Sequence, residues 1–208
     1  MILKLNYKER IDAMQIVKKT YSGIQSLPLD GMLLDKRRVF LCNTITTETA
    51  NLILKELLFL EDMNHLEPIK LMIDSPGGEI VAGLKLYDQI QAMDTPVDIY
   101  CTGMAASMAA IILAGGKKGH RFIVKHSEVM LHEPLISAAT GEITGSATSI
   151  QKTAESIMKT KKMIVELLAK HTGQSLKKIQ RIVSADNCIL NAEQAVAFGI
   201  CDMIVDRV

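Results

Sequence analysis

The sequence predicts a layered α/β domain whose strands run parallel. Short apolar strands alternate along the chain with amphipathic helices, and three strand–helix crossovers follow one another, as parallel pairing requires. The chain has 208 residues, of which 48% are hydrophobic and 23% charged, so it has the size and composition of one globular domain with a real core. No sequence period repeats, which excludes a solenoid.

A local sequence pattern predicts each strand and helix. Strands are expected over the short apolar runs at 37–42, 69–74, 97–102, 120–125, 127–134 and 201–206. Helices are expected over the amphipathic or buried segments at 47–64, 80–93, 107–114, 150–170 and 191–198. Asn191 and Gln194 fit a capping pair, and Gly173 and Gly199 fit helix ends. Residues 135–149 are rich in small side chains and Thr, which indicates an exposed hairpin or loop.

Two helices have a predicted apolar face. For the helix at 47–64 the expected face is Leu52, Leu54, Leu57, Leu58 and Leu60. For the helix at 150–170 it is Ile150, Ala154, Ile157, Ile164 and Leu168, at near-heptad spacing.

Charge and cysteine usage exclude several classes of function. Lysine and arginine number 24 against 23 acids, so no basic footprint indicates nucleic acid or an anionic membrane. The four cysteines are scattered without a CxxC pair or zinc spacing, and we expect no metal. The N-terminus lacks a secretory apolar region, and the longest uncharged apolar stretch, 104–116, is too short to span a bilayer. We therefore expect a soluble cytoplasmic protein with reduced thiols.

Ser107 is the first candidate for chemistry. It lies in TGMAASMAAIILAGG, where a strand gives way to a helix, so free backbone N–H groups and the positive end of the helix dipole surround its hydroxyl. Its small neighbours leave room for a substrate carbonyl, which favours an acyl-transfer nucleophile. From the local sequence alone, a serine N-cap on a buried helix is the better supported interpretation, and G-x-S-x-G is absent.

A serine nucleophile needs a base and an orienting carboxylate. Among five histidines, His132 differs in ending an apolar strand, although such a histidine is more often structural. Asp74, Asp88 and Asp186 all remain open as the carboxylate. The SPGG turn after the second strand could aim a backbone N–H at an oxygen, or could simply be a tight connection. Neither GxGxxG nor GxxxxGK[ST] is present to bind phosphate.

Four segments in order make the sequence resemble the ClpP family of self-compartmentalising serine peptidases. They are DSPGGEIVAGLKLYDQIQ, CTGMAASMAA, SEVMLHEPL and ADNCILNAEQAVAFGICDMI, and the likeness extends over residues 33–205. The resemblance implies Ser107 as the nucleophile, His132 as the general base and Asp186 as the orienting carboxylate. It also implies that the backbone N–H groups of Gly78 and Met108 form the oxyanion hole.

The resemblance implies an architecture as well. The family fold is a ClpP/crotonase-type repeated ββα spiral with a protruding handle helix, so we expect one peptidase domain at 33–208 with its handle at about 135–171. Residues 1–32 would be a divergent N-terminal segment. Family members form heptameric rings, usually stacked as tetradecamers, around a closed chamber. They need no cofactor, and ATP is used only by the partner, an AAA+ Clp unfoldase.

Departures from the family pattern leave two alternative functions open. The handle segment is about five residues longer than usual, and Ala185 stands where an arginine commonly contributes to ring–ring contacts. Asp74 and Glu133 replace the more usual Asn and Gln beside the site. A weakly active or regulatory ring subunit paired with an active paralogue is one alternative. Crotonase-type acyl-CoA chemistry is the other, disfavoured because a triad has no evident use there.

Overall fold

A mostly parallel sheet organises the molecule. The computed structural model describes residues 15–20, 23–134, 146–184 and 188–208. The strands are β1 (Gln15–Thr20), β2 (Gly23–Pro28), β3 (Arg38–Leu41), β4 (Ile69–Ser75), β5 (Val97–Ala106), β6 (Arg121–Val124), β7 (Glu128–Leu131), β8 (Cys188–Leu190) and β9 (Met203–Val205). The helices are α2 (Leu29–Asp35), α3 (Thr47–Met63), α4 (Ile80–Ala92), α5 (Met108–Ala114), α6 (Ala147–Thr172), α7 (Leu176–Val183) and α8 (Ala192–Phe198).

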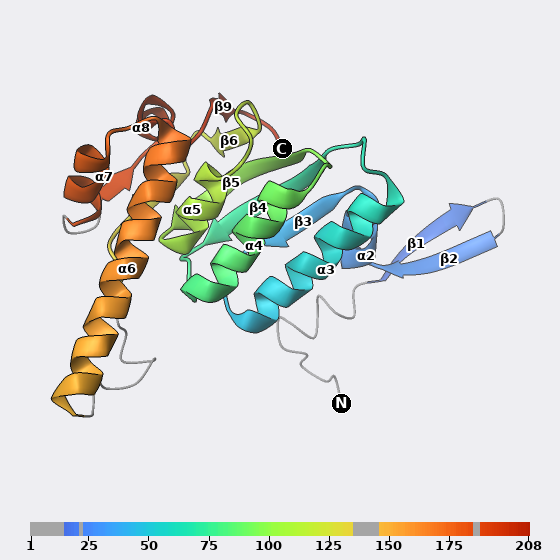
Figure 1. Ribbon diagram of the computed structural model, residues 1–208. Coiled ribbons are helices and arrows are strands. Elements are labelled where there is room, and N and C mark those ends of the chain that lie inside the picture. Colours follow the sequence, from blue (N-terminus) through green and yellow to red (C-terminus); the bar gives the residue numbers. More distant parts are fainter. Residues whose placement is uncertain (1–14, 21–22, 135–145, 185–187) are drawn as a thin grey trace, which may run out of the picture.

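The predicted parallel pairing is confirmed. The sheet has the order β3-β4-β5-β6-β9, all parallel, with β7 added to β5 and β8 antiparallel to β7. Helices α3, α4 and α5 cover one face of this sheet (Figure 1). A separate antiparallel hairpin, β1–β2, extends from the body beside α2 (Figure 1). The sequence analysis assigned no element to the hairpin, α2, α7 or β8.

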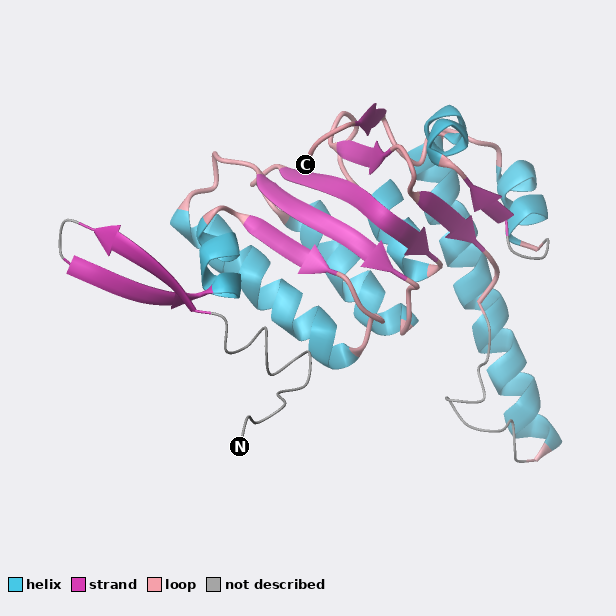
Figure 2. Ribbon diagram, turned by 180° about the vertical axis from the view of Figure 1, so that it is seen from behind, coloured by secondary structure: helices cyan, strands magenta, loops and turns pink. Residues whose placement is uncertain are grey.

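None of the helices in the described part of the chain covers the other face of the central sheet (Figure 2). One row of side chains crosses it at a single register: Phe40, Met72, Tyr100, Phe122 and Met203. The Tyr100 and Phe122 rings stack at 4.8 Å between centroids, whereas Phe40 and Met203 are 42% and 56% exposed. Met72 and Tyr100 in the middle of this set, called the open apolar row, are buried, so its hydrophobic exposure is confined to the two ends.

Helix α3 begins at a local capping signal, but its buried face differs from the predicted one. Thr46 and Thr49 form a reciprocal capping box at its start. Its buried residues repeat at steps of three and four and are Ala50, Ile53, Leu57 and Leu60. The predicted face was therefore partly wrong: Leu52 and Leu58 are 59% and 41% exposed, because the sheet contacts a stripe rotated from the one that the leucines alone suggest.

Strand β5 changes neighbours along its length. Residues Ile99–Cys101 pair with β6, and residues Met104–Ala106 pair with β7. The register with β4 shifts between Ile73 and Ser75, which lets the strand bend at this point. The carboxyl ends of β5 and β7 consequently lie side by side, where parallel sheets usually hold their functional groups.

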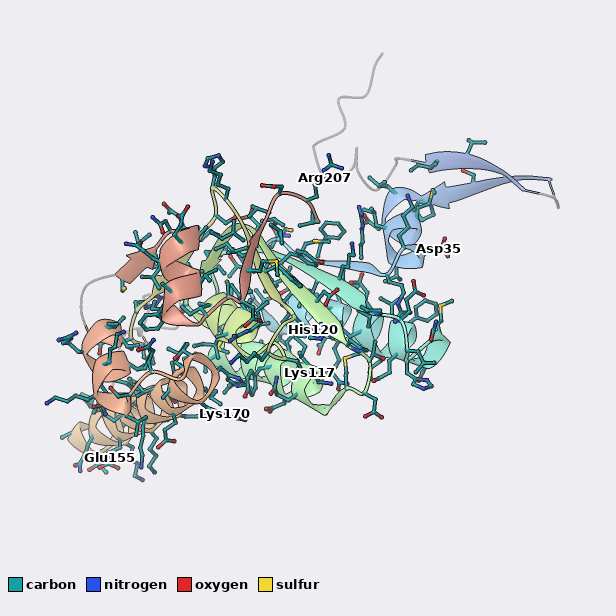
Figure 3. The ribbon with its side chains drawn as sticks, turned by 90° about the horizontal axis from the view of Figure 1, so that it is seen from above. Asp35, Lys117, His120, Glu155, Lys170 and Arg207 are labelled. Atoms are coloured by element: carbon teal, nitrogen blue, oxygen red, sulfur yellow. The ribbon has the colours of Figure 1, made fainter. Side chains whose placement is uncertain are left out.

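Helix α6 is 26 residues long and leaves the body at its N-terminal half (Figure 1). Seen from above, the labelled Glu155 lies farther from the sheet than the labelled Lys170 (Figure 3). Only Ile164, Val165 and Leu168 are buried, so the predicted apolar face is covered at its C-terminal end alone, and Ile150 is 43% exposed. The predicted loop or hairpin at 135–149 lies mostly outside the described residues, and residues 147–149 belong to α6.

Two buried arginines tie the ends of elements together. Arg37 donates to the carbonyl oxygens of Leu60, Asn64, Glu67 and Pro68 at 2.8–3.3 Å, which satisfies the C-terminal end of α3. Arg121 donates to the carbonyls of Ala114, His171 and Gly199 and forms a bidentate ion pair with Asp202. Each guanidinium thus donates to several carbonyl groups at the ends of helices and turns.

The predicted helix caps in the C-terminal part of the chain are confirmed. Asn191 and Gln194 form a capping box at the start of α8. Gly173 and Gly199 end α6 and α8 in the left-handed conformation, with φ of 71° and 92°. No helix among the described residues combines the length and apolarity needed to cross a membrane.

Asp202→Asn should destabilise the fold by about 2 kcal/mol at neutral pH, because Arg121 would lose its buried charged partner. Burial raises the pKa of Asp202, but hydrogen bonds from Arg121 and Gly119 outweigh it and hold the pKa below 3.8. A lowered folded-state pKa contributes stability above the unfolded pKa and loses it as the pH falls through the folded value. The difference between wild type and variant should therefore shrink on acidification.

Urea unfolding from neutral pH to below the carboxyl range measures this, with the exposed Asp62→Asn as the control. A difference that stays constant down to the lowest pH would contradict the role of the ion pair.

Candidate active site

Ser107 occupies a strained turn between β5 and α5. Its φ and ψ are 54° and −120°, a conformation rare for residues other than glycine and worth roughly 1–3 kcal/mol of strain. Two hydrogen bonds hold it there: the Ser107 N–H donates to the Met130 carbonyl at 2.9 Å, and the Ala110 N–H donates to the Ser107 carbonyl at 3.1 Å. The sheet on one side and the helix on the other therefore impose the strain.

The Ser107 hydroxyl does not cap α5. No side-chain capping bond is present at this position, and a φ of 54° is outside the extended region that N-caps use. The local N-cap interpretation of this serine is therefore wrong. The side chain instead lines a small pocket, so its hydroxyl remains available for an external group.

Gly77 packs directly against Ser107. A Cβ atom at Gly77 would lie 2.6 Å from the Ala106 carbonyl oxygen and 2.8 Å from the Ser107 Cβ, and its φ is 88°. The buried Ser75 hydroxyl holds this turn, donating to the Asn43 carbonyl at 2.6 Å and accepting from the Gly77 N–H at 3.1 Å. The SPGG turn is thus more than a tight connection, because only glycine permits this approach to the serine.

Two backbone N–H groups flank the same turn. Met108 opens α5, so its N–H has no carbonyl four residues earlier within the helix. Gly78 forms a parallel bridge with Ile45, in which Ile45 bonds to Gly77 and Glu79. In that pattern the Gly78 N–H points away from Ile45. Gly77 lies between these two N–H groups: it precedes Gly78, and a Cβ atom added to Gly77 would lie 3.0 Å from the Met108 nitrogen.

His132 follows β7 and reaches the same pocket as Ser107. The pairing of Ala106 with Met130 aligns the two strand ends. The pocket is otherwise apolar and includes Ile80, Met108, Ile111, Leu131, Pro134, Ile164 and Leu168. The His132 Nδ1 lies 2.6 Å from the Glu133 carbonyl oxygen. Because a carbonyl only accepts, Nδ1 carries the proton and Nε2 is left as the basic atom.

The remaining histidines are engaged elsewhere or are exposed. His120 pairs with Asp98 at 2.6 Å, and the His171 Nε2 lies 2.7 Å from the Tyr87 hydroxyl. Burial, helped by Lys170 and Arg121, lowers the pKa of His171. His65 and His126 are exposed. Sequence reasoning identified His132 correctly as the strand-end histidine but did not find the Tyr87 partner of His171.

The structure accounts for two of the three carboxylates that the sequence left open. Asp74 accepts the Met104 N–H at 2.9 Å, and Asp88 lines a groove between α3 and α4. Neither lines the pocket of Ser107 and His132. Asp186 lies outside the described residues. Its role as the orienting carboxylate therefore stays a prediction. The effect of Ala185 on contacts between rings stays a prediction as well.

The four thiols are poor competitors for the nucleophile. Burial raises the pKa of Cys101 to about 11 and also raises the pKa of Cys42, Cys188 and Cys201. None of these cysteines lines the pocket with His132, whereas Ser107 does, so the hydroxyl is the group that a base can activate. No group of three or more His, Cys, Asp or Glu side chains within the described ranges is arranged to hold a metal ion.

The pocket also contains residues that sequence reasoning did not connect with the site. Ile164 and Leu168 come from α6, far along the chain from Ser107. Their helical spacing was visible in the sequence, but which surface they cover was not. The family model described as Clp protease matches residues 23–208, a range that includes every predicted site residue.

Ser107→Gly should raise the free energy of unfolding by about 1 kcal/mol relative to Ser107→Ala. Both variants lack the hydroxyl, but only glycine adopts a φ of 54° without strain. Urea unfolding of the two variants side by side measures the difference. Equal stabilities, or a more stable alanine variant, would mean that the turn is not strained.

Proposed function

This chain belongs to the Clp protease family, and from that premise we propose that it is a serine endopeptidase acting on unfolded polypeptides and short peptides. The observation that carries the proposal is the shared pocket of Ser107 and His132, with Ser107 held in a strained turn. Enzymes keep such strain where it presents a reactive group. The proposal needs no cofactor, because hydroxyl, imidazole and water supply the chemistry.

The proposed reaction passes through an acyl-enzyme. The Ser107 hydroxyl oxygen attacks the peptide carbonyl while the His132 Nε2 takes its proton, and the imidazolium then protonates the leaving amine. The N–H groups of Gly78 and Met108 are the proposed donors to the oxyanion. Asp186 is the proposed carboxylate that stabilises the imidazolium. Water, activated by the same imidazole, then releases the acyl group.

Substrate would bind as an extended chain beside the SPGG turn. A strand added at this edge would be held mainly through main-chain hydrogen bonds, which favours broad specificity. The apolar side chains of Ile80, Ile111 and Leu168 border the space next to Ser107, so they would contact a substrate side chain bound there. The pocket therefore adds a preference for uncharged, apolar residues at that position.

We further propose that the chain works in heptameric rings, single or stacked as tetradecamers, fed by an AAA+ Clp unfoldase. Exposed apolar side chains in two places support assembly: Phe40 and Met203 at the ends of the open apolar row, and Met158 on the projecting half of α6, which is 63% exposed. Enclosed active sites would admit only unfolded chains, and the partner would use the ATP. The cytoplasmic location expected from the sequence stays a prediction.

A weakly active or regulatory ring subunit is the second candidate. It is favoured by Ala185 in place of the usual arginine and by the longer handle segment. It is disfavoured by the joint presence of Ser107 and His132 in one pocket. Activity of the purified chain assembled alone distinguishes the two candidates.

Ser107→Ala should abolish both hydrolysis of fluorogenic peptides and labelling by a serine-directed acylating probe. The reason is that no other described nucleophile lines the pocket. Cys42→Ala, which removes an exposed thiol, is the control and should leave both properties intact. Native mass measurement establishes the assembly for each protein. Wild-type rings with neither property would instead favour the regulatory subunit.

Peptides that differ only in the residue before the scissile bond should be cleaved at different rates. We expect leucine to exceed glutamate by roughly 100-fold in kcat/KM, because the apolar walls would bury a carboxylate without a partner. A matched peptide series measures the ratio. Equal values for the two peptides would exclude this pocket as the one that receives the side chain.

A further inference from the structure

An ion pair links the residue after His132 to helix α6. The Glu133 Oε2 and the Lys161 Nζ are paired, with side chains 46% and 22% exposed. The two residues are 28 positions apart in the sequence, so the pair joins two separate elements. Such a contact has a different meaning from an ion pair within one helix, because it fixes where one element lies relative to another.

The Glu133 residue holds His132 through its backbone as well. Its carbonyl oxygen lies 2.6 Å from the His132 Nδ1 and accepts the Nδ1 proton. The position of this carbonyl therefore sets both the tautomer and the tilt of the imidazole, and with them the direction of Nε2. An N–H donor can be shared by two acceptors, so this bond supplements an orienting carboxylate.

Helix α6 contributes to the same pocket directly. Ile164 lies one turn after Lys161 and lines the pocket together with Leu168, one turn further on. Lys161 therefore lies on the face of α6 that turns toward the site. Toward its N-terminus the helix leaves the body, and residues 147–156 are exposed (Figure 1). Any contact made with this projecting half would act on a helix whose other end touches the pocket.

We propose that Lys161 and Glu133 form a positioning pair that couples the placement of helix α6 to the orientation of His132. The inference rests on the proposed peptidase function and deepens it. The pair does not contact substrate. Lys161 fixes the Glu133 side chain, and the Glu133 carbonyl oxygen accepts the hydrogen bond that orients the His132 imidazole.

Helix α6 offers a matched control for the charge itself. Lys162 pairs with Glu166 at 3.9 Å, within the helix, and both side chains are more than half exposed. Loss of this neighbouring pair removes the same charge from the same helix without touching Glu133. A merely structural or long-range electrostatic role would affect both lysines alike.

The test measures kcat and KM for a fluorogenic peptide with Lys161→Met, Lys162→Met and Lys161→Arg. We expect Lys161→Met to lower kcat about fivefold with KM unchanged, because His132 is displaced while the peptide-binding edge is not. Lys162→Met should match wild type, and Lys161→Arg should restore kcat to within about twofold. The charge swap of Glu133→Lys with Lys161→Glu should recover part of the loss that either single change causes.

Wild type and Ser107→Ala are measured alongside, which separates the two hypotheses. Inactive wild-type rings would contradict the proposed function. Active wild-type rings with equal kcat in Lys161→Met and Lys162→Met would overturn the positioning pair alone. If Lys161→Met fails to assemble, Glu133→Gln, which keeps an acceptor for Lys161 but loses the charge, replaces it. A wild-type kcat in Glu133→Gln together with full activity of the Glu133→Lys variant would overturn the inference equally.

Discussion

The parallel pairing of β5 with β7 is the constraint on which the site depends. Its last hydrogen bond runs from the Ser107 N–H to the Met130 carbonyl, so the strand pairing itself fixes the backbone of the serine. The chain turns into α5 immediately afterwards, and the two requirements together force the φ of 54°. Because β7 then ends at Leu131, the next residue, His132, emerges at the same edge.

Close packing around this turn leaves little freedom. Gly77 approaches Ser107 so closely that no side chain fits between them, and Gly78 is held against Ile45 by the parallel bridge. The buried core behind the turn consists of small and aliphatic residues, among them Ala105, Ala109 and Ala110, all essentially unexposed. A rigid support of this kind is what a preorganised site requires, because displaced donors and nucleophiles lose most of their effect.

The rest of the structure ties the strands that carry the site to the helices around them. Arg121 at the start of β6 gathers carbonyls from α5, α6 and the turn after α8, and Asp202 neutralises it. Within the described residues, the C-terminal half of helix α6 contacts the body, and Tyr87 through His171 and Glu133 through Lys161 add polar contacts to it. Phe40 and Met203 at the ends of the open apolar row and the projecting half of α6 remain exposed on a single chain.

The amino-acid sequence by itself determined the local features of this protein: the alternation of strands and helices, the capping box at Asn191, the glycine ends of α6 and α8, and Ser107 and His132 as candidates. These follow from periodicity and from residues whose backbone preferences are local. Only the tertiary structure decided which stripe of α3 is buried, that Ser107 is strained and not a cap, that α6 supplies Ile164 and Leu168 to the pocket, and that Lys161 reaches Glu133. Those features depend on contacts between segments far apart in the chain, and the pattern within either segment carries no information about its partner.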